Sequence, residues 1–431
     1  MRQFLRTFFV AAFLLAGVSM LAQNRRHIDN YRYPDQRGVN VFEDPKDSIA
    51  TFDGVKVRVG GSFALQFQAL DHSYAGNALD TDGNVINLQQ IGYNFNLATA
   101  NLDLDVALAP GVRMHLRTYL SSRHHPEPYV KGGYFQIDGL DFISEGLLDN
   151  LMKYATIRIG HMENNYGDAH FRRTDNAQAI YNPFVGNLIM DSFTTEIGAE
   201  VYYQRNGFIG MVGFTNGKLN QDVKSSNGKT GGAAFIAKLG YDKQISDDLR
   251  LRLTGSLYNT GYTARNVLYS ADRAGSRYYF VLEQEGASAS GNFRSGRFDP
   301  GFSNKITAVM INPFVKYRGL EFFGTIEMTS GRSLAESDRR NTNQYAGELI
   351  YRFGHNENFY VGGRYNMVDA ELAGGDDVTI DRYQFSAGWF MTKNILVKAE
   401  YVNQQHHDYA TGNILEGGKF HGGMLEAVIS F

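Results

Sequence analysis

Apolar and polar residues alternate with a period of two along most of the chain. The stretch VKVRVGGSFALQFQAL begins at Val55. Within it, Val57 and Val59 share one face, whereas Arg58 and Gln66 share the other. Successive side chains of a β-strand point to opposite sides of the sheet, so this pattern predicts strands with one apolar and one polar face. The run is about as long as the 9–11 tilted residues that carry a strand across a bilayer.

Similar segments recur to the C terminus and predict an all-β chain. They lie near residues 102–108, 112–120, 157–159, 196–204, 249–257, 326–328, 348–353, 382–389 and 395–401. Short connections occur at residues 110–111, 206–207, 246–248, 318–319, 355–358 and 393–394. Longer polar connections lie near residues 71–90, 122–128, 164–193, 217–229, 263–303, 332–342, 370–378 and 407–419. Short turns on one rim and long loops on the other are typical of a transmembrane antiparallel β-barrel. The number of segments predicts about 16 strands, or more broadly an even number between about fourteen and eighteen.

Three places depart from this pattern. Residues 139–153 (GLDFISEGLLDNLMK) predict a short amphipathic helix where a short turn is expected. The alternation changes phase between Phe95 and Leu102, which predicts a β-bulge. Pro313 lies inside an apparent strand and has no N–H for the ladder, so a bulge or a strand break is expected there.

The polar face of the predicted strands carries many charges. A Lys or Arg on the lipid face costs roughly 2–4 kcal/mol at the bilayer midplane, so this face must line water. The residues predicted to point inward are Arg58, Arg113, Arg117, Arg158, Arg250, Arg252, Glu327, Glu348, Arg352, Arg364, Arg382, Lys398 and Glu400. A polar lumen in a barrel of this size is an aqueous channel unless something plugs it.

Aromatic content supports the same fold. The chain is 13% aromatic, with 26 Tyr and 30 Phe, although its mean hydropathy is only −0.33. Tyrosines near strand ends suit the aromatic girdles at the two membrane interfaces. The candidates are Tyr119, Tyr203, Tyr241, Tyr317, Tyr351, Tyr365 and Tyr401. A secreted β-sandwich or solenoid is the alternative, but sandwich strands usually run about 5–6 residues, shorter than these.

The N terminus predicts export. Residues 1–22 read as a signal peptide, with Arg2 and Arg6 before a largely apolar stretch, Phe8 to Leu21, that is too short for a comfortable membrane helix. A short membrane anchor is the alternative for this segment. Residues 23–54 are polar and irregular and are interpreted as a periplasmic N-terminal extension, followed by the barrel over residues 55–431.

Charge and cysteine content exclude several classes of protein. The formal net charge of −3 gives no indication of a nucleic-acid partner. The absence of Cys excludes a disulfide framework, a thiolate nucleophile, Cys-ligated zinc and a lipoprotein anchor.

The most informative segment is IRIGHMENNYGDAHFRRTDNAQAIYNPFVGNLIMDSF, residues 157–193. A strand leads into a long loop that carries Asp168, His170, Arg172, Arg173 and Asp175. If this loop folds into the lumen, it forms a pore constriction in which neighbouring Arg and Asp side chains bias ion selectivity. The alternative is an ordinary exposed loop with solvated charges.

Other motifs are weaker. The Gly-Lys-Thr within residues 227–232 lacks the first glycine and the strand–loop–helix context of a phosphate-binding loop. The pairs His124-His125 and His406-His407 have no acidic residue at metal-ligand spacing. Residues 80–84 (DTDGN) resemble part of a calcium loop without its terminal Glu. No G-x-S-x-G occurs, so we expect no cofactor, no metal and no enzymatic activity, although an assembled Ser–His–acid site in a barrel enzyme is kept as a third hypothesis.

The chain ends in MLEAVISF, with Leu425, Ala427, Ile429 and Phe431 on one face. A last strand that ends in an aromatic residue resembles the C-terminal signal through which the barrel assembly machinery handles bacterial outer-membrane barrels. Phe431 is therefore the predicted barrel-closure residue.

The signal peptide, the alternating body, the segment IRIGHMENNYGDAHFRR and the terminal ISF together resemble the phosphate-selective porin O/P-like family, especially its Bacteroidetes-type members. The resemblance spans nearly all of the mature chain and implies a Gram-negative, sixteen-strand porin, usually a homotrimer. The resemblance also implies candidate residues for anion contact, which are Arg113, Arg117, Arg158, Arg172 and Arg173. This sequence departs from the family pattern of a basic lumen because acidic residues are also predicted on the lumen side. They are Asp103, Asp105, Glu196, Glu200, Glu327 and Glu348.

The sequence thus predicts an outer-membrane porin for passive diffusion of small hydrophilic solutes or ions. The expected partners of the porin are outer-membrane lipid and small solutes or anions. The sequence does not decide between a preference for phosphate-like anions and general diffusion. The alternative is a non-conducting barrel that acts as an adhesin or as a component of secretion or surface assembly. In that case the long loop 263–303, with its apolar stretch Tyr278 to Leu282, binds partners.

Overall fold

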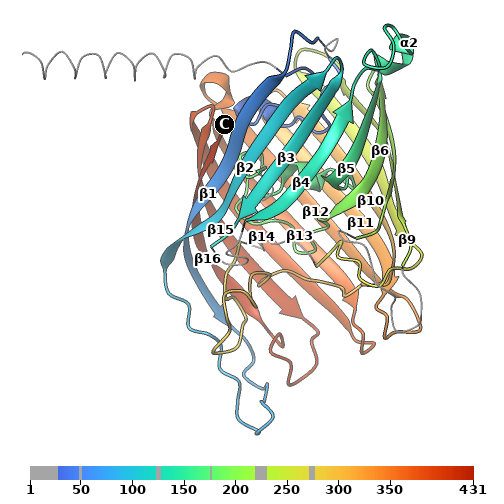
Figure 1. The fold of residues 1–431 in the computed structure, drawn as a ribbon. Coiled ribbons are helices and arrows are strands. Elements are labelled where there is room, and N and C mark those ends of the chain that lie inside the picture. Colours follow the sequence, from blue (N-terminus) through green and yellow to red (C-terminus); the bar gives the residue numbers. More distant parts are fainter. Residues whose placement is uncertain (1–27, 48–50, 123–127, 175–176, 219–230, 271–276) are drawn as a thin grey trace, which may run out of the picture.

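The computed structural model describes residues 28–47, 51–122, 128–174, 177–218, 231–270 and 277–431. Across these residues, sixteen antiparallel strands form one closed barrel in which β1 pairs with β16 (Figure 1). The strands are β1 (Lys56–Ser73), β2 (Asn94–Ala109), β3 (Val112–Leu120), β4 (Tyr129–Ile137), β5 (Ala155–Glu163), β6 (Thr195–Arg205), β7 (Phe208–Thr215), β8 (Ala234–Gln244), β9 (Leu249–Thr260), β10 (Lys305–Tyr317), β11 (Leu320–Arg332), β12 (Arg340–Phe353), β13 (Phe359–Glu371), β14 (Asp377–Thr392), β15 (Ile395–His407) and β16 (Lys419–Ser430). The predicted barrel and its strand number are confirmed, and the sandwich and solenoid alternatives are wrong.

The alternation along each strand sorts side chains between the two faces of the wall. Val59 is 61% exposed and Phe385 is 60% exposed on the outer face, whereas Asp105 and Glu327 are fully buried on the inner face. The thirteen charged residues that the sequence assigned to the lumen are buried or half-buried there. An apolar exterior around a charged interior is the arrangement of an outer-membrane β-barrel.

One girdle assignment is wrong. The Tyr119 side chain is buried, and the Lys131 ammonium lies 4.4 Å from the centre of its ring. Tyr119 has the same parity along β3 as Arg117 and His115, so its ring points into the barrel. The other predicted girdle tyrosines are exposed or half-buried.

The two rims of the barrel differ, as Figure 1 shows. Tight turns such as Asn206-Gly207 lie on the rim that also carries the C terminus, and the long loops lie on the opposite rim. In outer-membrane barrels the short-turn rim faces the periplasm. This rim also carries a 3-10 turn, η3 (His355–Glu357), and the helix α2 (Asp149–Met152), which is four residues long and lies within the predicted helical region 139–153. Among the described residues, no helix is long and apolar enough to cross a membrane.

The two predicted strand irregularities are present. The pairing of β1 with β2 shifts at Ala98, which is the bulge expected between Phe95 and Leu102. Pro313 lies within β10, where the ladder to β9 continues but the pairs with β11 skip Asn312 and Pro313. The Asn312 side-chain amide donates to the Gly324 carbonyl of β11 at 3.0 Å and takes the place of the missing ladder bond.

The C terminus closes the barrel. Phe431 exchanges two backbone hydrogen bonds with Gly61 of β1, both 3.0 Å long. The Phe431 side chain is 39% exposed on the outer face.

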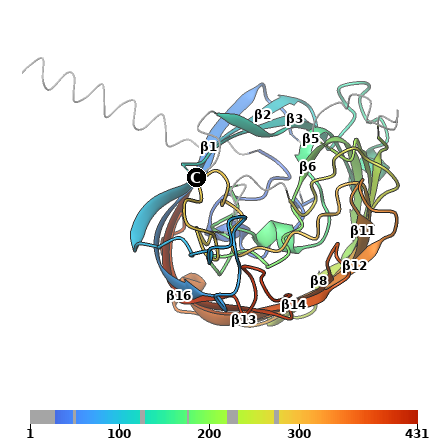
Figure 2. The same ribbon diagram turned by 90° about the horizontal axis from the view of Figure 1, so that it is seen from below.

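The interior of the barrel is not empty. Figure 2 looks along the barrel and shows chain segments inside the ring of strands. They belong to residues 28–47, which include the 3-10 turn η1 (Gln36–Gly38), and to the connections β5–β6 and β9–β10, which carry fully buried residues such as Ile189 and Tyr278. Residues 28–47 therefore lie within the short-turn mouth of the barrel.

Candidate functional site in the barrel lumen

The connection from β5 to β6 is here called the inward loop, and its described residues, 164–174 and 177–193, lie in the interior. Its backbone is bound by polar side chains of distant strands: the N–H of Val185 donates to Glu400 at 2.7 Å and the N–H of Ile189 donates to Asn366 at 2.7 Å. The Lys398 ammonium donates to three carbonyl oxygens of the loop. A loop with little regular structure can be buried here because the charged lumen satisfies its backbone groups.

Asp168 anchors the first part of the inward loop. Its carboxylate accepts hydrogen bonds from Lys238 at 2.9 Å, from Arg252 at 2.8 Å and from the Thr254 hydroxyl at 2.7 Å. The Asp168 N–H donates to the Asn312 side chain at 2.8 Å. Burial by itself raises the pKa of Asp168, but the charges of Arg252 and Lys238 outweigh it and hold that pKa well below its ordinary value.

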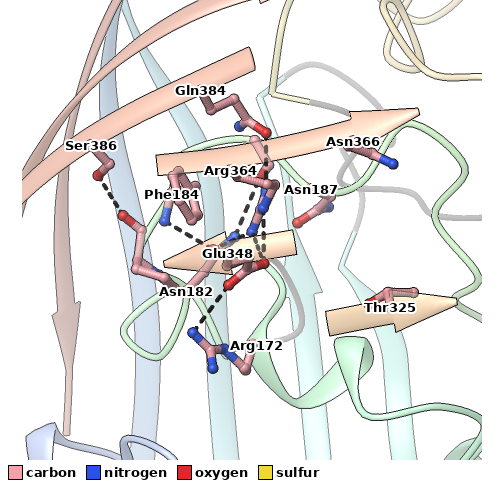
Figure 3. Close-up of polar contacts among 12 residues, drawn as sticks. Arg172, Asn182, Phe184, Asn187, Thr325, Glu348, Arg364, Asn366, Gln384 and Ser386 are labelled. Atoms are coloured by element: carbon pink, nitrogen blue, oxygen red, sulfur yellow. Dashed lines mark hydrogen bonds and ion pairs between the residues drawn. The ribbon is translucent and has the colours of Figure 1, made fainter. Parts of the chain in front are cut away.

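Arg172, at the end of the 3-10 turn η2 (Ala169–Arg172), pairs with the barrel wall (Figure 3). Its guanidinium lies 3.1 Å from the Glu348 carboxylate of β12, which Arg364 of β13 approaches to 2.7 Å from the other side. The Phe323 ring lies 4.7 Å from the guanidinium carbon of Arg172. Burial lowers the pKa of Arg172 despite its acidic neighbour.

The remaining predicted residues of the loop have separate partners. Arg173 pairs with Asp191 of the same loop at 2.5 Å. His170 lies 2.7 Å from Glu163 of β5. Asp175 lies outside the described residues. The structure therefore does not join these side chains into one cluster, because each pairs locally or with the wall.

Residues 28–47, here called the N-terminal segment, bring two more carboxylates into the lumen. Glu43 lies 2.8 Å from Arg252 and 3.4 Å from Lys238. Asp44 accepts a hydrogen bond of 2.5 Å from each of Arg113 and Arg158. The charges of Arg158 and Arg113 lower the pKa of Asp44 although burial opposes them.

The N-terminal segment also contacts the inward loop. The Arg32 guanidinium lies 3.7 Å from the centre of the Tyr181 ring and donates to the Phe171 carbonyl. The Phe42 ring packs edge-on against Phe171 at 6.0 Å. The sequence left open whether this segment plugs the periplasmic mouth, because residues 28–47 carry no periodic pattern that could reveal which face is buried.

A cavity of about 140 Å³ lies between the N-terminal segment, the inward loop and strands β3 to β5. The basic side chains around it are Arg32, Arg113, Arg117, Lys131 and Arg158. The acidic ones are Glu43, Asp44, Asp103 and Glu163. Three of the predicted anion-contact arginines, Arg113, Arg117 and Arg158, line this cavity, whereas Arg172 and Arg173 lie outside its lining. Lys131 was missed because it lies at a β-bulge: the pairing of β3 with β4 skips this residue, so the alternation of β4 does not predict its inward position.

A second connection, from β9 to β10, also enters the lumen. The Tyr278 hydroxyl donates to Glu400 at 2.6 Å, and Tyr279 and Gln68 of β1 exchange two hydrogen bonds. The expectation that Tyr278 to Leu282 forms a partner-binding apolar stretch on an outer loop is therefore wrong. Tyr278, Val281 and Leu282 pack inside, against Phe420 and Met424 of β16.

The weaker motifs assemble no site within the described chain. His406 is buried beside the Gly418 carbonyl, and His407 pairs with Asp381. The Asp80 carboxylate accepts the N–H groups of Asp82 and Asn84 in its own turn. Residues 124, 125 and most of 227–232 lie outside the described part of the chain. No group of three or more His, Asp or Glu side chains that could hold a metal occurs among the described residues.

Comparison with known proteins supports the fold. No family model and no curated protein matches this sequence. Among solved structures, an anion-selective porin from Comamonas acidovorans is similar with a TM-score of 0.55 and 12% identity, over 88% of this chain and 100% of the porin. A loop-deletion mutant of OmpT, an outer membrane protein of Vibrio cholerae, is similar with a TM-score of 0.50 and 10% identity, over 88% of this chain and 100% of that one. At these identities the likeness establishes the shared architecture: this chain has the fold of an outer-membrane β-barrel.

Proposed function

We propose that this barrel is an outer-membrane porin for small hydrophilic solutes, with a preference for anions. One observation carries the proposal: a closed barrel encloses a charged lumen whose cavity is lined by five basic side chains. Charges in a narrow, water-filled passage with low-dielectric walls act strongly on passing ions.

The anion preference rests on the residues of the wall itself. Arg113, Arg117, Lys131 and Arg158 project into the cavity from β3, β4 and β5, and the wall acids among its lining residues are Asp103 and Glu163. Phosphate is one candidate solute, as the family resemblance implies. A homotrimer is likewise proposed from that resemblance, and light scattering of the detergent-solubilised protein tests it.

The filled lumen favours a second candidate function. The N-terminal segment, the inward loop and the β9–β10 connection all occupy the interior, and buried ion pairs and hydrogen bonds tie them to the wall. A barrel that remains filled in this way acts as a non-conducting scaffold for adhesion or for surface assembly.

Conductance of the refolded mature protein in a planar bilayer separates the two functions. A porin gives discrete current steps, and under a KCl gradient the sign of the reversal potential reports whether Cl⁻ or K⁺ passes more readily. Phosphate in place of chloride tests the finer preference. A folded barrel that gives no steps, both as wild type and as the Glu43→Gln/Asp44→Asn variant, overturns the porin proposal in favour of the scaffold.

A further inference from the structure

The N-terminal segment holds the Arg113–Arg158 pair through a single carboxylate. The terminal nitrogens of both guanidinium groups donate to Oδ2 of Asp44, each at 2.5 Å, and both arginines also contact Gln136 Oε1, at 2.9 and 2.8 Å. Two guanidinium groups that converge on one oxygen are a strong carboxylate site, because charge-assisted hydrogen bonds to arginine are short and directional.

This site opens on the cavity. Asp44, Arg113 and Arg158 all belong to its lining, so a solute in the cavity lies beside the position that the Asp44 carboxylate occupies. The adjacent residue Glu43 covers a second basic pair, Lys238 and Arg252. The segment thus presents two neighbouring carboxylates to four wall cations.

The N-terminal segment changes the charge balance of the cavity. The wall contributes Arg113, Arg117, Lys131 and Arg158 against Asp103 and Glu163, an excess of basic over acidic side chains. The acids of the N-terminal segment therefore offset a positive wall, and an anionic solute would offset the same charges in their place.

The segment is held mainly by polar contacts. Its regular structure is the three-residue turn η1, and its main apolar anchor is Phe42, in the cluster with Phe171, Phe314 and Phe323. Outside this cluster, ion pairs such as Lys46–Asp138 and hydrogen bonds such as Tyr31–Asp105 attach it to the wall. An anionic ligand can form the same kind of charge-assisted hydrogen bonds with these wall residues.

We propose that residues 28–47 form a displaceable plug, and that the Arg113–Arg158 pair is a binding subsite for small carboxylate solutes, which Asp44 occupies while the plug is docked. The inference rests on the proposed porin function and names its solute class. A carboxylate solute competes with Asp44, and its binding favours the open barrel, because a ligand shifts the equilibrium toward the state that it binds.

Succinate serves as the probe: a succinate ion bound at the Arg113–Arg158 pair of an open barrel occupies the passage, so its binding is measured as block of the chloride current through that barrel. We expect Asp44→Asn to conduct more than the wild type, and succinate to block it at about tenfold lower concentration, because the internal competitor is gone. Arg113→Gln/Arg158→Gln should lose the succinate block. Asp376→Asn, which makes the same charge change on an exposed loop, should behave as the wild type. Equal conductance and equal succinate block in Asp44→Asn and wild type overturn the proposal.

A second measurement detects displacement of the plug in a chain that keeps both Glu43 and Asp44. The sequence has no Cys, so Asn40→Cys supplies a unique thiol, at a position that is 6% exposed when the segment is docked. We expect succinate, but not the same concentration of chloride, to speed maleimide labelling of this thiol several-fold. No acceleration overturns displacement by carboxylates. If succinate accelerates labelling but the barrel does not conduct, the plug and its subsite are supported and the porin function is rejected. Failure of the plug proposal and failure of the porin proposal are therefore distinguishable.

Discussion

The Asp168 carboxylate accepts two hydrogen bonds from the Arg252 guanidinium, each 2.8 Å long, so that the inward loop is held to β9 by a bidentate ion pair. Lys238 of the adjacent strand β8 adds a third bond, and Glu43 of the N-terminal segment contacts both cations. Arg252 also lies 3.0 Å from Asp242 of β8, so the wall, the loop and the segment meet in one network in which Asp168 and Glu43 face Lys238 and Arg252.

Neutralising Asp168 should destabilise the protein. Asp168→Asn leaves Lys238 and Arg252 buried with less negative charge, and breaking a buried pair in this way costs about 3–5 kcal/mol. Urea unfolding of the refolded protein in detergent micelles measures the loss. Asp168→Asn/Lys238→Met restores the charge balance and should recover part of it. A loss below about 1 kcal/mol for the single variant would show that the network does not hold the loop.

Ion selectivity should depend more on the cavity arginines than on those buried in the inward loop. Arg158 lines the cavity, whereas Arg173 is 2% exposed and pairs with Asp191 outside it. We expect Arg158→Gln to lower the chloride-to-potassium permeability ratio about twofold, and Arg173→Gln to change it much less. Reversal potentials under a salt gradient give both ratios. A larger effect of Arg173→Gln would instead place the filter inside the loop.

Docking of the N-terminal segment should weaken in acid. Burial raises the pKa of Glu43, but the charges of Arg252 and Lys238 prevail and lower it from 4.5 to about 2. A carboxyl whose folded-state pKa is lowered stabilises the docked state fully above its unfolded pKa, and this contribution is lost as the pH falls through the folded value. Conductance should therefore stay constant from pH 7 to about 5 and rise below pH 4.5. The Glu43→Gln variant should lack much of this rise, and a step near pH 6.5 would instead indicate histidine.

Loss of the last residue should impair barrel closure. Deleting Phe431 removes two backbone hydrogen bonds with Gly61, each worth about 1 kcal/mol net, together with the aromatic end of β16. Phe431→Leu keeps the backbone bonds and serves as the control. The folded fraction, read from the shift in gel mobility on heating, should fall for the deletion more than for the substitution. Equal folded fractions for both variants would mean that the aromatic ring matters more than the backbone closure.

The sequence by itself determined the barrel and the orientation of its wall. Alternation with a period of two assigns every side chain of a strand to lipid or lumen, so Arg158 and Glu348 were placed inside from local pattern alone. The sequence also predicted a bulge between Phe95 and Leu102, which the strand pairing places at Ala98, and an irregularity at Pro313. The prediction failed at Tyr119, which was assigned to the outer girdle because it is aromatic, although the alternation along β3 places its side chain in the lumen.

Tertiary structure alone decided what fills the lumen. Asp44 and Arg113 are 69 positions apart in the sequence, and Val185 and Glu400 are 215 apart. Irregular segments such as residues 28–47 have no periodicity from which burial can be inferred, and their polar side chains suit water as well as a charged interior. They dock because the closed wall brings unpaired cations and carboxylates together at one place, and that surface exists only once all sixteen described strands have paired.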